Sequence, residues 1–577
     1  MIDFIERPID RQAAAFLCRG AKDDAGALCA VVSLLSQAVG QGHVCLDLEE
    51  IAGQLARIPG RDEPLRLPDA AHLISALRSL PTLGGPGEHR PLILDDYGRL
   101  YLYRYFRYEA LLADAIRARA VSQTDGSDAY AEQLDRYFAP SENAGEDRQR
   151  QAALTALRRR FSVISGGPGT GKTTTVVRIL GLLLEQTGGD RLRIAMAAPT
   201  GKAAARLTSS IAALRESLPC ADEVKRAVPG QVTTIHRLLG TLPGSTGFRH
   251  NERNPLPCDA VIVDEASMVD LPLMTALVTA LPPQARLILI GDRDQLASVE
   301  AGAVLGDICR AAESPDSAVA GCVTVLDRNY RFGDGSGIAA LSHAVNAGDD
   351  HKALRLLADA GSSAIALEVT PTRDTMKKRL AAPVLEGFRA YLEAETPAEA
   401  LRLFDRFRIL TALREGPWGA TGMNHAAETL LHEAGLIRRD TPFYRGRPVL
   451  VTENDYIHKL FNGDTGIILP DPDPDTGHLR AFFAASDGTI RAIPPEFLPK
   501  HETAFAMTVH KSQGSEFERV LMVLPPEDSI LLTRELIYTG ITRAKQSVTI
   551  WSDEAVFGGA VKRRTERRSG LREKIII

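Results

Sequence analysis

The segment FSVISGGPGTGKT, residues 161–173, decides the fold of this chain. It starts as a short apolar run and continues as G-x-x-x-x-G-K-T, and a helical pattern follows it. A glycine-rich loop between a strand and a helix lets backbone N–H groups surround phosphates, and the helix N-terminus adds positive potential. The segment therefore predicts an α/β domain whose loop binds the phosphates of a nucleotide.

Two side chains of this loop have distinct predicted roles. Lys172 can reach the β- and γ-phosphates, and the Thr173 hydroxyl can ligate Mg²⁺. We therefore expect ATP and Mg²⁺ as cofactors. The loop residues expected to contact ATP are Gly166, Gly167, Pro168, Gly169, Thr170, Gly171, Lys172, Thr173 and Thr174.

A second apolar strand, VIVDE at 261–265, ends in two acids. The carboxyl end of a strand is where an α/β sheet opens its ligand crevice. We expect Asp264 to hold Mg²⁺ and Glu265 to polarise the attacking water. Two adjacent acids at a strand end can also be simple surface charge, but the phosphate loop favours the catalytic interpretation.

Phosphoryl transfer also needs a sensor of the γ-phosphate and cationic groups that stabilise the transition state. Gln295 follows a strand at 287–290 and is the predicted sensor. Arg331 and Arg543 are the candidate cations. Taken alone, each of these arginines would be a surface or ion-pair residue, so their assignment depends on the wider pattern described below.

Composition and charge limit the class of protein. With 577 residues the chain is too long for one core, since cores stop growing at roughly 250–300 residues, so we expect three or four domains. Hydrophobic residues make up 44% and charged residues 24%, and the formal net charge is −5. Any nucleic-acid contact must therefore be a local groove rather than a whole basic face. The seven scattered cysteines, without metal spacing, and the lack of a leader or a membrane-length apolar run predict a soluble cytoplasmic protein.

The alternation of strands and helices gives the domain plan. Strands at 161–165, 192–197, 260–264 and 286–290 predict a parallel sheet. A second α/β unit runs from about 346 to 430 and resumes after about 503. A β-rich segment with the turn-forming run PDPDPD at 470–475 lies between them and suggests a small inserted barrel.

The first 110 residues carry no catalytic motif. They contain an apolar, helical stretch at 27–39 and two predicted strands at 92–94 and 100–106. The second strand mixes aromatic and basic residues, which can stack bases but more often form an ordinary strand. We interpret this region as a docking or specificity module, followed by a polar linker and helical lead-in at 118–150.

Taken together, these motifs resemble those of superfamily 1 helicases, in the same order and over about 400 residues. The matching stretches are 149–150 (Q motif), 166–173 (motif I), 198–204 (Ia), 233–238 (Ib), 264–268 (II), 291–295 (III), 330–332 (IV), 506–517 (V) and 538–543 (VI). The resemblance adds Gln149 and Gly514 to the expected ATP contacts. It also gives Arg331 and Arg543 their place as arginine fingers.

Within that superfamily the chain resembles the RecD family, the α subunits of exodeoxyribonuclease V, the RecBCD complex. Distinctive stretches are GHVCL at 42–46, GDRDQLASVEAGAVLGD at 291–307, LREGP at 413–417, FNGD at 461–464 and TERRSGL at 565–571. The resemblance implies an α/β fold with two RecA-like motor domains and ATP between them. The implied domains are a mostly helical N-terminal docking domain at 1–110, motor domain 1 at 111–345, motor domain 2 at 346–430 and 503–577, and an SH3-like insert at 431–502.

The DNA contacts follow from the same resemblance and from residue chemistry. Hydroxyl, imidazole and ammonium groups suit phosphate tracking without sequence readout. The predicted contacts are Pro199, Thr200, Lys202, Thr234, His236, Thr508, His510 and Lys511. For His510 a structural turn histidine is the alternative, and the basic tail at 562–568 fits an interdomain surface better than DNA. The family has a small hydroxyl residue at the position of Asn329, and the stretch at 244–258 is short for a strand-separating protrusion.

The resemblance implies an ATP-dependent 5′-to-3′ DNA helicase that joins RecB-like and RecC-like subunits to process double-strand DNA ends for recombination and repair. The nuclease activity of such a complex is not expected in this chain. Three alternatives remain: a stand-alone RecD-like helicase, an inactive ATPase scaffold, and an RNA motor. The short region before Gln149 disfavours the first, and the intact catalytic residues disfavour the second. Phosphate and stacking contacts do not by themselves distinguish DNA from RNA.

Overall fold

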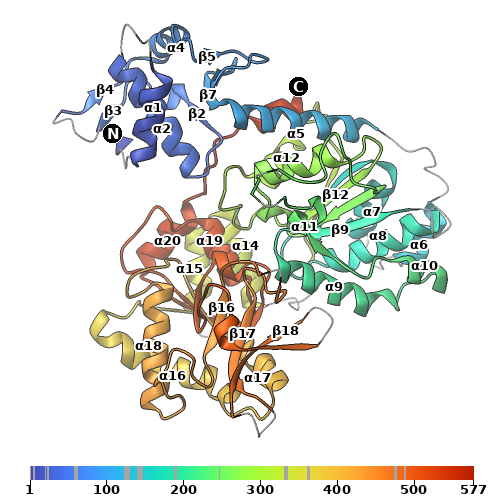
Figure 1. The fold of residues 1–577 in the computed structure, drawn as a ribbon, viewed down its shortest axis with the longest axis vertical. Coiled ribbons are helices and arrows are strands. Elements are labelled where there is room, and N and C mark those ends of the chain that lie inside the picture. Colours follow the sequence, from blue (N-terminus) through green and yellow to red (C-terminus); the bar gives the residue numbers. More distant parts are fainter. Residues whose placement is uncertain are drawn as a thin grey trace.

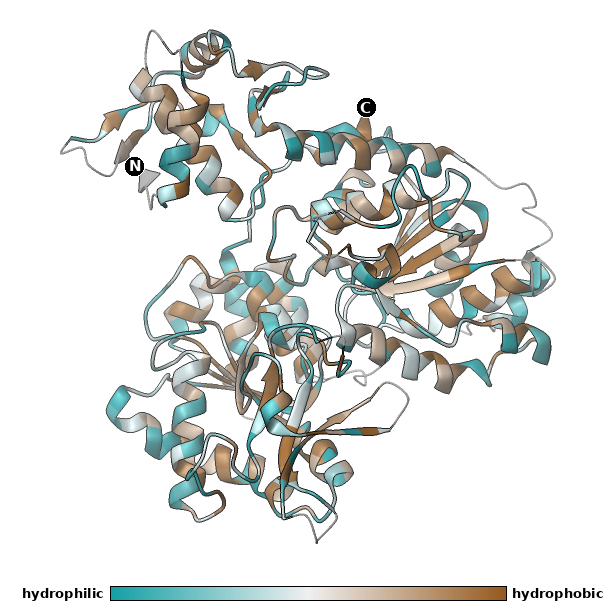
Figure 2. Cartoon of the chain, viewed as in Figure 1, coloured by the Kyte–Doolittle hydropathy of each residue, from teal (hydrophilic) through white to brown (hydrophobic). Residues whose placement is uncertain are grey.

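The computed structural model describes residues 2–3, 7–19, 21, 25–57, 63–122, 130–138, 147–186, 192–242, 244–245, 247–330, 336–359, 364–455, 457–472, 477–485 and 489–577. Figure 1 shows two α/β units, one above the other, with a smaller N-terminal unit beside the upper one. Hydrophobic residues gather in the sheets and on the helix faces that cover them (Figure 2).

The first α/β unit is built on a six-stranded parallel sheet of order β10-β9-β11-β12-β8-β13. Its strands are β8 (Phe161–Gly166), β9 (Ile194–Ala198), β10 (Thr233–Thr234), β11 (Ala260–Val263), β12 (Arg286–Gly291) and β13 (Val323–Leu326). Its helices are α6 (Ala131–Tyr137), α7 (Arg148–Arg158), α8 (Lys172–Gln186), α9 (Gly201–Arg215), α10 (Asp222–Ala227), α11 (Ile235–Leu239), α12 (Leu271–Ala280) and α13 (Val304–Ala311). The four predicted strands are confirmed, because strands covered by helices on both faces are continuously apolar.

The second α/β unit has a five-stranded parallel sheet of order β14-β23-β22-β15-β21. The strands are β14 (Ile365–Glu368), β15 (Phe407–Thr411), β21 (Ala506–Thr508), β22 (Phe517–Val523) and β23 (Ala544–Trp551). The helices are α14 (Gly337–Ala347), α15 (Asp350–Ala358), α16 (Arg373–Leu392), α17 (Pro397–Phe404), α18 (Ala420–Glu433), α19 (Arg534–Ile541) and α20 (Glu554–Lys562). The α/β class predicted from the sequence is therefore confirmed.

A five-stranded antiparallel sheet interrupts the second unit, in the order β19-β18-β17-β16-β20. Its strands are β16 (Pro448–Val451), β17 (Thr465–Pro470), β18 (Leu479–Ala484), β19 (Ile490–Ile493) and β20 (His501–Thr503). It has a small core of its own, formed mainly by strand residues that include Val449, Ile468 and Phe483. We call this segment the insert; its SH3-like character stays a prediction.

The N-terminal unit packs helices against two small sheets. Its elements are β1 (Ile2–Asp3), α1 (Pro8–Leu17), α2 (Ala25–Gly40), β2 (Cys45–Asp47), α3 (Leu48–Ile51), β3 (Leu55–Arg57), β4 (Leu65–Arg66), α4 (Ala70–Arg78), β5 (Leu83–Gly84), β6 (Leu92–Leu94) and β7 (Arg99–Leu102). The apolar residues of α2, among them Leu28, Val31 and Leu35, are fully buried in this unit's own core. The predicted apolar helix is therefore confirmed, its apolar residues are not offered to a partner, and the docking role of the whole module stays a prediction.

The aromatic and basic stretch at 100–106 also differs from its prediction. The strand ends at Leu102, and Tyr103 begins α5 (Tyr103–Val121), a helix that packs against α12. Tyr101 is fully buried, so base stacking by this side chain is excluded. The domain boundary predicted after residue 110 falls inside this continuous helix, because helix packing rather than composition joins the two units here.

The last residues connect all three units. After α20 the chain leaves the second α/β unit, and its final helix, α21 (Leu571–Ile576), packs beside α5 and α13 (Figure 1). Leu571 and Ile575 are buried in the core that α5 shares with the first parallel sheet. We call residues 563–577 the C-terminal strap. No described helix is long and apolar enough to cross a membrane.

Candidate ATP cleft and nucleic-acid groove

The phosphate loop joins the C-terminal end of β8 to the N-terminus of α8. Gly169 and Gly171 have φ values of +82°, a backbone region in which a side chain is strained. The Lys172 ammonium donates to the carbonyls of Gly166 and Gly167, at 2.5 and 3.0 Å. The lysine thus lies over its own loop, and its contact with phosphate stays a prediction.

The two predicted acids follow β11 in the first sheet. The backbone N–H of Glu265 donates to the Asp264 carboxylate at 2.9 Å. Glu265 has a φ of +50°, which is unusual for a residue with a side chain and marks local strain of the kind found at active sites. Burial, with Glu265 next to it, raises the pKa of Asp264 to about 6. A nearby cation is what would keep this carboxylate charged at neutral pH.

The loop after β12 contains the predicted sensor. Asp292 is buried and accepts hydrogen bonds from the Gln295 amide and the Tyr538 hydroxyl, both at 2.9 Å. The other end of the Gln295 amide accepts from the Arg543 guanidinium at 2.9 Å. Burial raises the pKa of Asp292. Gln295 therefore lies between the first sheet and an arginine of the second unit.

Arg543 lies between α19 and β23 and is almost completely buried. Besides Gln295, its guanidinium donates to the backbone carbonyls of Thr539 and Ser515, at 3.1 and 3.2 Å. Burial lowers its pKa, and the nearby Glu265 opposes this. It forms no ion pair with a carboxylate among the described residues, so its charge is available to an anionic ligand.

These groups line one cavity of about 330 Å³ between the two α/β units. Its volume is in the range of small-molecule sites, roughly 300–1,000 Å³. Residues of the first unit are Pro168, Gly169, Gly171, Lys172, Thr173, Thr174, Ala203, Arg206, Leu207, Ser210, Asp264, Glu265, Gln295 and Tyr330, and those of the second are Glu516 and Arg543. Most of the predicted nucleotide site therefore lies in a single cleft.

Five of the predicted ATP residues lie beside this cavity rather than in it. Gly166, Gly167 and Thr170 line an adjoining cavity of about 220 Å³ on the β13 side. The amide of Gln149 donates to the Thr170 carbonyl at 3.3 Å, so it supports the loop from outside. Gly514 has a φ of +73°. A Cβ atom added at this glycine would lie 3.7 Å from the methyl carbon of Ala203. Arg331 lies outside the described residues, so its predicted role stays a prediction.

Two charged residues of the cleft were not predicted from the sequence. Arg206, one turn after Lys202 on α9, forms an ion pair with Glu516 of the second unit. Burial lowers the pKa of Arg206, but Glu516, with Glu265 and Asp264 adding to its effect, more than offsets this, so that the pKa is raised. The four-residue spacing from Lys202 could have indicated a shared helix face, but nothing in the sequence pairs residues 310 positions apart.

The stretch around Asn329 also contacts the phosphate loop. Its side-chain amide donates to the Pro168 carbonyl at 2.9 Å, and the Tyr330 backbone N–H donates to the Gly169 carbonyl at 2.8 Å. Asn329, which differs from the family pattern, thus donates a side-chain hydrogen bond to the phosphate loop.

The predicted DNA contacts of the first unit begin two helices. The Thr200 hydroxyl accepts from the Ala203 N–H and caps α9, and the Thr234 hydroxyl accepts from the Arg237 N–H and caps α11, both at 3.2 Å. Pro199 precedes the first cap, and Lys202 is half-buried, with a pKa that burial lowers. These caps fix the start of α9 and of α11 at one edge of the sheet. The backbone N–H groups at a helix N-terminus are suitable donors for phosphates.

A groove of about 480 Å³ runs between these helix starts and the insert. Its lining includes Thr234 and Arg237 from the first unit and Lys459, Phe461 and Arg491 from the insert. Three cations and an aromatic ring along one groove suit a single nucleic-acid strand. His236 follows Thr234 and packs against Phe248 at 5.9 Å between ring centroids, and burial lowers its pKa.

The three predicted contacts near 510 do not line this groove. The Thr508 hydroxyl accepts from the Lys511 N–H at 3.4 Å, and the Lys511 ammonium pairs with Glu502 at 2.5 Å. His510 lies in the short helix η3 (His510–Ser512), and burial lowers its pKa, with Arg567 of the strap adding to this effect. This environment fits the structural alternative for His510 as well as it fits a phosphate contact.

Comparison with known proteins places this architecture in a family. The family model "RecBCD enzyme subunit RecD, N-terminal domain" matches residues 5–101, a model of the AAA domain matches 149–301, and a UvrD-like helicase C-terminal domain matches 503–551. The RecBCD enzyme subunit RecD of Mycobacterium tuberculosis is 41% identical over 574 residues, which cover 98% of this chain and 94% of that protein. The chain belongs to the RecD family. The sequence-based assignment is thereby confirmed.

Two further proteins are similar to this RecD-family chain. The ATP-dependent RecD2 DNA helicase of Deinococcus radiodurans is 31% identical, over 83% of this chain and 59% of that protein. The crystal structure of Bacteroides Pif1 bound to ssDNA superposes with a TM-score of 0.38 and 14% identity, over 71% of this chain and 93% of that one.

Proposed function

We propose that this chain is the ATP-driven motor subunit of a RecBCD-type complex, which moves 5′ to 3′ along single-stranded DNA and unwinds duplex ends. One observation carries the proposal: Lys172, Asp264 and Glu265 of the first unit share a single cavity with Arg543 of the second. A nucleotide in that cavity contacts both units at once. Its hydrolysis therefore changes the contacts between them.

The residues of the cleft have different roles in phosphoryl transfer. Lys172 carries positive charge to the β- and γ-phosphates, and the glycine-rich loop supplies backbone N–H donors. Thr173 and Asp264 line the same cavity and offer the hydroxyl and carboxylate oxygens that Mg²⁺ prefers, so together they would hold the ion. Bound Mg²⁺ neutralises phosphate charge.

Glu265 and Arg543 act on the reacting atoms. Glu265 orients the water and takes its proton as the oxygen attacks the γ-phosphorus and the bond to the ADP oxygen breaks. Arg543 balances the negative charge that spreads over the transferred group. Because Arg543 is already held by three hydrogen bonds, little side-chain entropy is lost when it meets the phosphate.

The loop after β12 couples the cleft to the second unit. The Leu296 N–H donates to the Thr539 hydroxyl, and the Gln513 amide donates to the Leu296 carbonyl, both at 3.0 Å. With the bond from Tyr538 to Asp292, these contacts connect the sensor loop to two separate segments of the second unit. A change at the γ-phosphate position is thus transmitted as a relative movement of the two units.

Family membership supports DNA as the track and further subunits of a RecBCD-type complex as partners. The relatives are named as RecBCD subunits, and the N-terminal family model covers residues 5–101. The chain spans 94% of the Mycobacterium tuberculosis subunit but 59% of the Deinococcus radiodurans RecD2 helicase. The higher identity to the RecBCD subunit, 41% against 31%, and the match to the RecD N-terminal model favour a subunit with RecB-like and RecC-like partners over a stand-alone helicase, and the presence of Lys172, Asp264, Glu265, Gln295 and Arg543 in one cleft disfavours an inactive scaffold.

The experiment that tests direction is an unwinding assay on two tailed duplexes with the same base sequence. The chain, free or assembled with its partners, should open the duplex with a 5′ single-stranded tail when ATP and Mg²⁺ are present, and leave the one with a 3′ tail closed. A Lys172→Ala chain in the same assembly is the control for unwinding by another motor. Opening of only the 3′-tailed duplex by this motor would reverse the proposed polarity.

A further inference from the structure

A second, smaller cavity lies next to the ATP cleft and is surrounded by arginines. It measures about 80 Å³ and lies among α13, α19 and the strap. Five guanidinium groups contribute to its lining, those of Arg293, Arg310, Arg534, Arg564 and Arg567. Such a concentration of cations around a small space is unusual in a chain whose net charge is −5.

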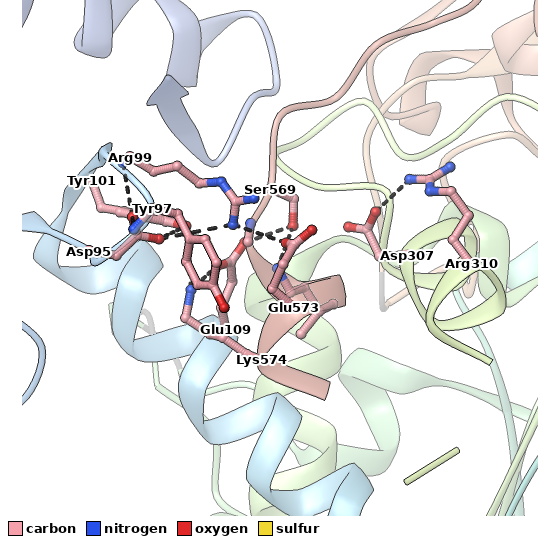
Figure 3. A network of polar contacts seen from close by, with 12 residues as sticks. Asp95, Tyr97, Arg99, Tyr101, Glu109, Asp307, Arg310, Ser569, Glu573 and Lys574 are labelled. Atoms are coloured by element: carbon pink, nitrogen blue, oxygen red, sulfur yellow. Dashed lines mark hydrogen bonds and ion pairs between the residues drawn. The ribbon is translucent and has the colours of Figure 1, made fainter. Parts of the chain in front are cut away.

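The arginines differ in how far their charge is balanced. Arg293 pairs with Glu313 at 3.0 Å, and Arg310 pairs with Asp307 at 2.5 Å. Figure 3 shows the second of these pairs beside the strap. The other three arginines form no ion pair with a carboxylate among the described residues.

Two of those three are held in place by neutral groups. Arg534 donates to the carbonyls of Val561, Asn346 and Lys562, and Arg567 donates to those of Gln41 and Ser298. Backbone carbonyls orient a guanidinium without cancelling its charge.

The third, Arg564, is exposed and has no hydrogen bond to a described residue. Two acids also line the cavity, Asp294 and Glu535. Glu535 accepts from the N–H and the hydroxyl of Thr565, at 2.9 and 2.8 Å. The lining therefore remains positive after both acids are counted.

A buried hydroxyl provides an independent observation. Ser267 lines the cavity and is 8% exposed, and its hydroxyl has no hydrogen-bond partner among the described residues. A buried polar group without a partner costs about 1–3 kcal/mol, so such groups in native structures call for an explanation. A ligand oxygen in the cavity would give this hydroxyl its partner.

We propose that this cavity is a binding site for a small oxyanion of the phosphate class. Its volume is far below the roughly 300–1,000 Å³ of sites for nucleotide-sized ligands, which excludes a second nucleotide. Guanidinium groups and a serine hydroxyl are the donors that tetrahedral oxyanions prefer. The site is separate from the γ-phosphate position, which Lys172 and Arg543 flank in the larger cavity.

The position of the cavity indicates the source of the anion. Gln295 lines both cavities, and Ser267 comes three residues after Asp264. Phosphate that leaves the γ-position on this side of the cleft would therefore meet the arginine cavity next. This assignment of the source rests on the proposed ATPase activity, whereas the binding site itself does not.

Binding is tested with radioactive inorganic phosphate and the full chain in equilibrium dialysis. A non-hydrolysable ATP analogue first occupies the main cleft, so that phosphate cannot bind at the γ-position. We expect one phosphate per chain, and a loss of at least about tenfold in affinity for Arg564→Gln and for Ser267→Ala, since each removes a hydrogen bond to a charged ligand. Arg564 is exposed and forms no hydrogen bond or ion pair among the described residues, so we expect its replacement to leave the fold intact.

The matched control is Arg572→Gln, which removes an exposed arginine of α21 that does not line the cavity. It should bind phosphate like the unchanged chain. Equal affinity in all three variants would overturn the proposal and identify an adventitious ion only. Absence of binding at millimolar phosphate would overturn it as well.

A single-turnover experiment distinguishes the two sources of phosphate. ADP formation is followed by chemical quench and phosphate release by a fluorescent phosphate-binding protein. If the site receives hydrolysed phosphate, release lags ADP formation in the unchanged chain, and Arg564→Gln shortens the lag at an unchanged hydrolysis rate. Simultaneous release and ADP formation, with phosphate binding retained, assigns the site to phosphate from solution. Normal hydrolysis without phosphate binding overturns this inference and leaves the proposed motor function standing.

Discussion

The ATP cleft and the strap junction both join distant parts of this chain, but they do so by different means. The contacts across the cleft are mostly polar, namely the hydrogen bonds from Arg543 to Gln295 and from Tyr538 to Asp292 and the ion pair of Arg206 with Glu516, and Leu296 adds an apolar contact. The strap instead buries Leu571 and Ile575 in a shared core. Hydrogen bonds can exchange partners at little net cost, whereas buried apolar side chains cannot leave their core without losing about 1.5–3 kcal/mol each.

The polar part of the strap junction reinforces this difference. The Glu109 carboxylate has no exposed surface and accepts from the Ser569 hydroxyl, the Gly570 N–H and the Lys574 ammonium, at 2.7, 2.9 and 2.7 Å (Figure 3). Arg99 of the N-terminal unit pairs with Glu573 at 2.9 Å. The comparison teaches that apolar burial and ion pairs hold the N-terminal unit and the strap to the first α/β unit, and we expect relative movement at the mostly polar cleft interface instead.

The largest expected effect lies on the cleft side of the comparison. Lys172→Ala and Glu265→Gln should each lower DNA-stimulated ATP hydrolysis by at least about 10²–10³, because each removes a group that handles charge in the transition state. Steady-state phosphate production measures this. Lys377→Ala, which breaks an exposed ion pair with Glu433, is the control and should keep its rate. Near-normal turnover in either cleft variant would show that the site is misplaced.

The next effect lies on the strap side and concerns stability rather than turnover. Lys574→Ala leaves the buried Glu109 carboxylate without its ion-pair partner, which typically costs about 3–5 kcal/mol. We expect a lower melting temperature in calorimetry and faster hydrogen exchange in α5 and α21. Arg572→Ala on the same helix should melt like the unchanged chain. A Lys574→Ala chain with unaltered exchange in α21 would mean that the junction does not hold the strap.

A smaller effect is expected from pH at the same junction. His43 accepts from the Arg568 N–H at 3.0 Å, and burial lowers its pKa to about 4 from 6.5, with Arg568 and Arg567 adding to the effect. The unfolded chain therefore binds a proton between pH 6.5 and 4 that the folded chain does not. Stability must fall as the pH is lowered through that window.

Melting temperatures across this pH window measure the contribution of His43. His43→Gln should flatten the dependence, and His351→Gln, at an exposed position on α15, should not. If His43→Gln and the unchanged chain had the same pH profile, the pKa of this imidazole would be the same in the folded and the unfolded chain.

The two regions also differ in how far the sequence predicted them. Lys172, Asp264 and Glu265 were predictable, because a local pattern of strand, glycine and acid determines where each side chain lies. The parallel strands were predictable for the same reason. The contact between Lys574 and Glu109 joins residues 465 positions apart, and no local pattern encodes such a pairing.

The features that the sequence did not settle have the same physical origin. An apolar helix can pack against a partner protein or in the core of its own domain, and α2 lies in the core of the N-terminal unit. The alternation of aromatic and basic residues after residue 100 suggested a longer strand, but packing of α5 on α12 gives a helix from Tyr103 onward. In both cases tertiary contacts decided between structures that the sequence left equivalent.

The central claim is that catalysis requires an arginine from the second unit, and hydrolysis by the Arg543→Ala chain tests it most directly. Single-turnover ATP hydrolysis in the presence of single-stranded DNA should slow by about 10²–10³, while binding of a fluorescent ATP analogue changes only a few-fold. Arg519→Ala, another arginine of the second sheet that lies outside the cleft, should hydrolyse ATP at the unchanged rate. Hydrolysis by Arg543→Ala at the rate of the Arg519→Ala control would contradict the claim, because the first unit alone would then suffice for the chemistry.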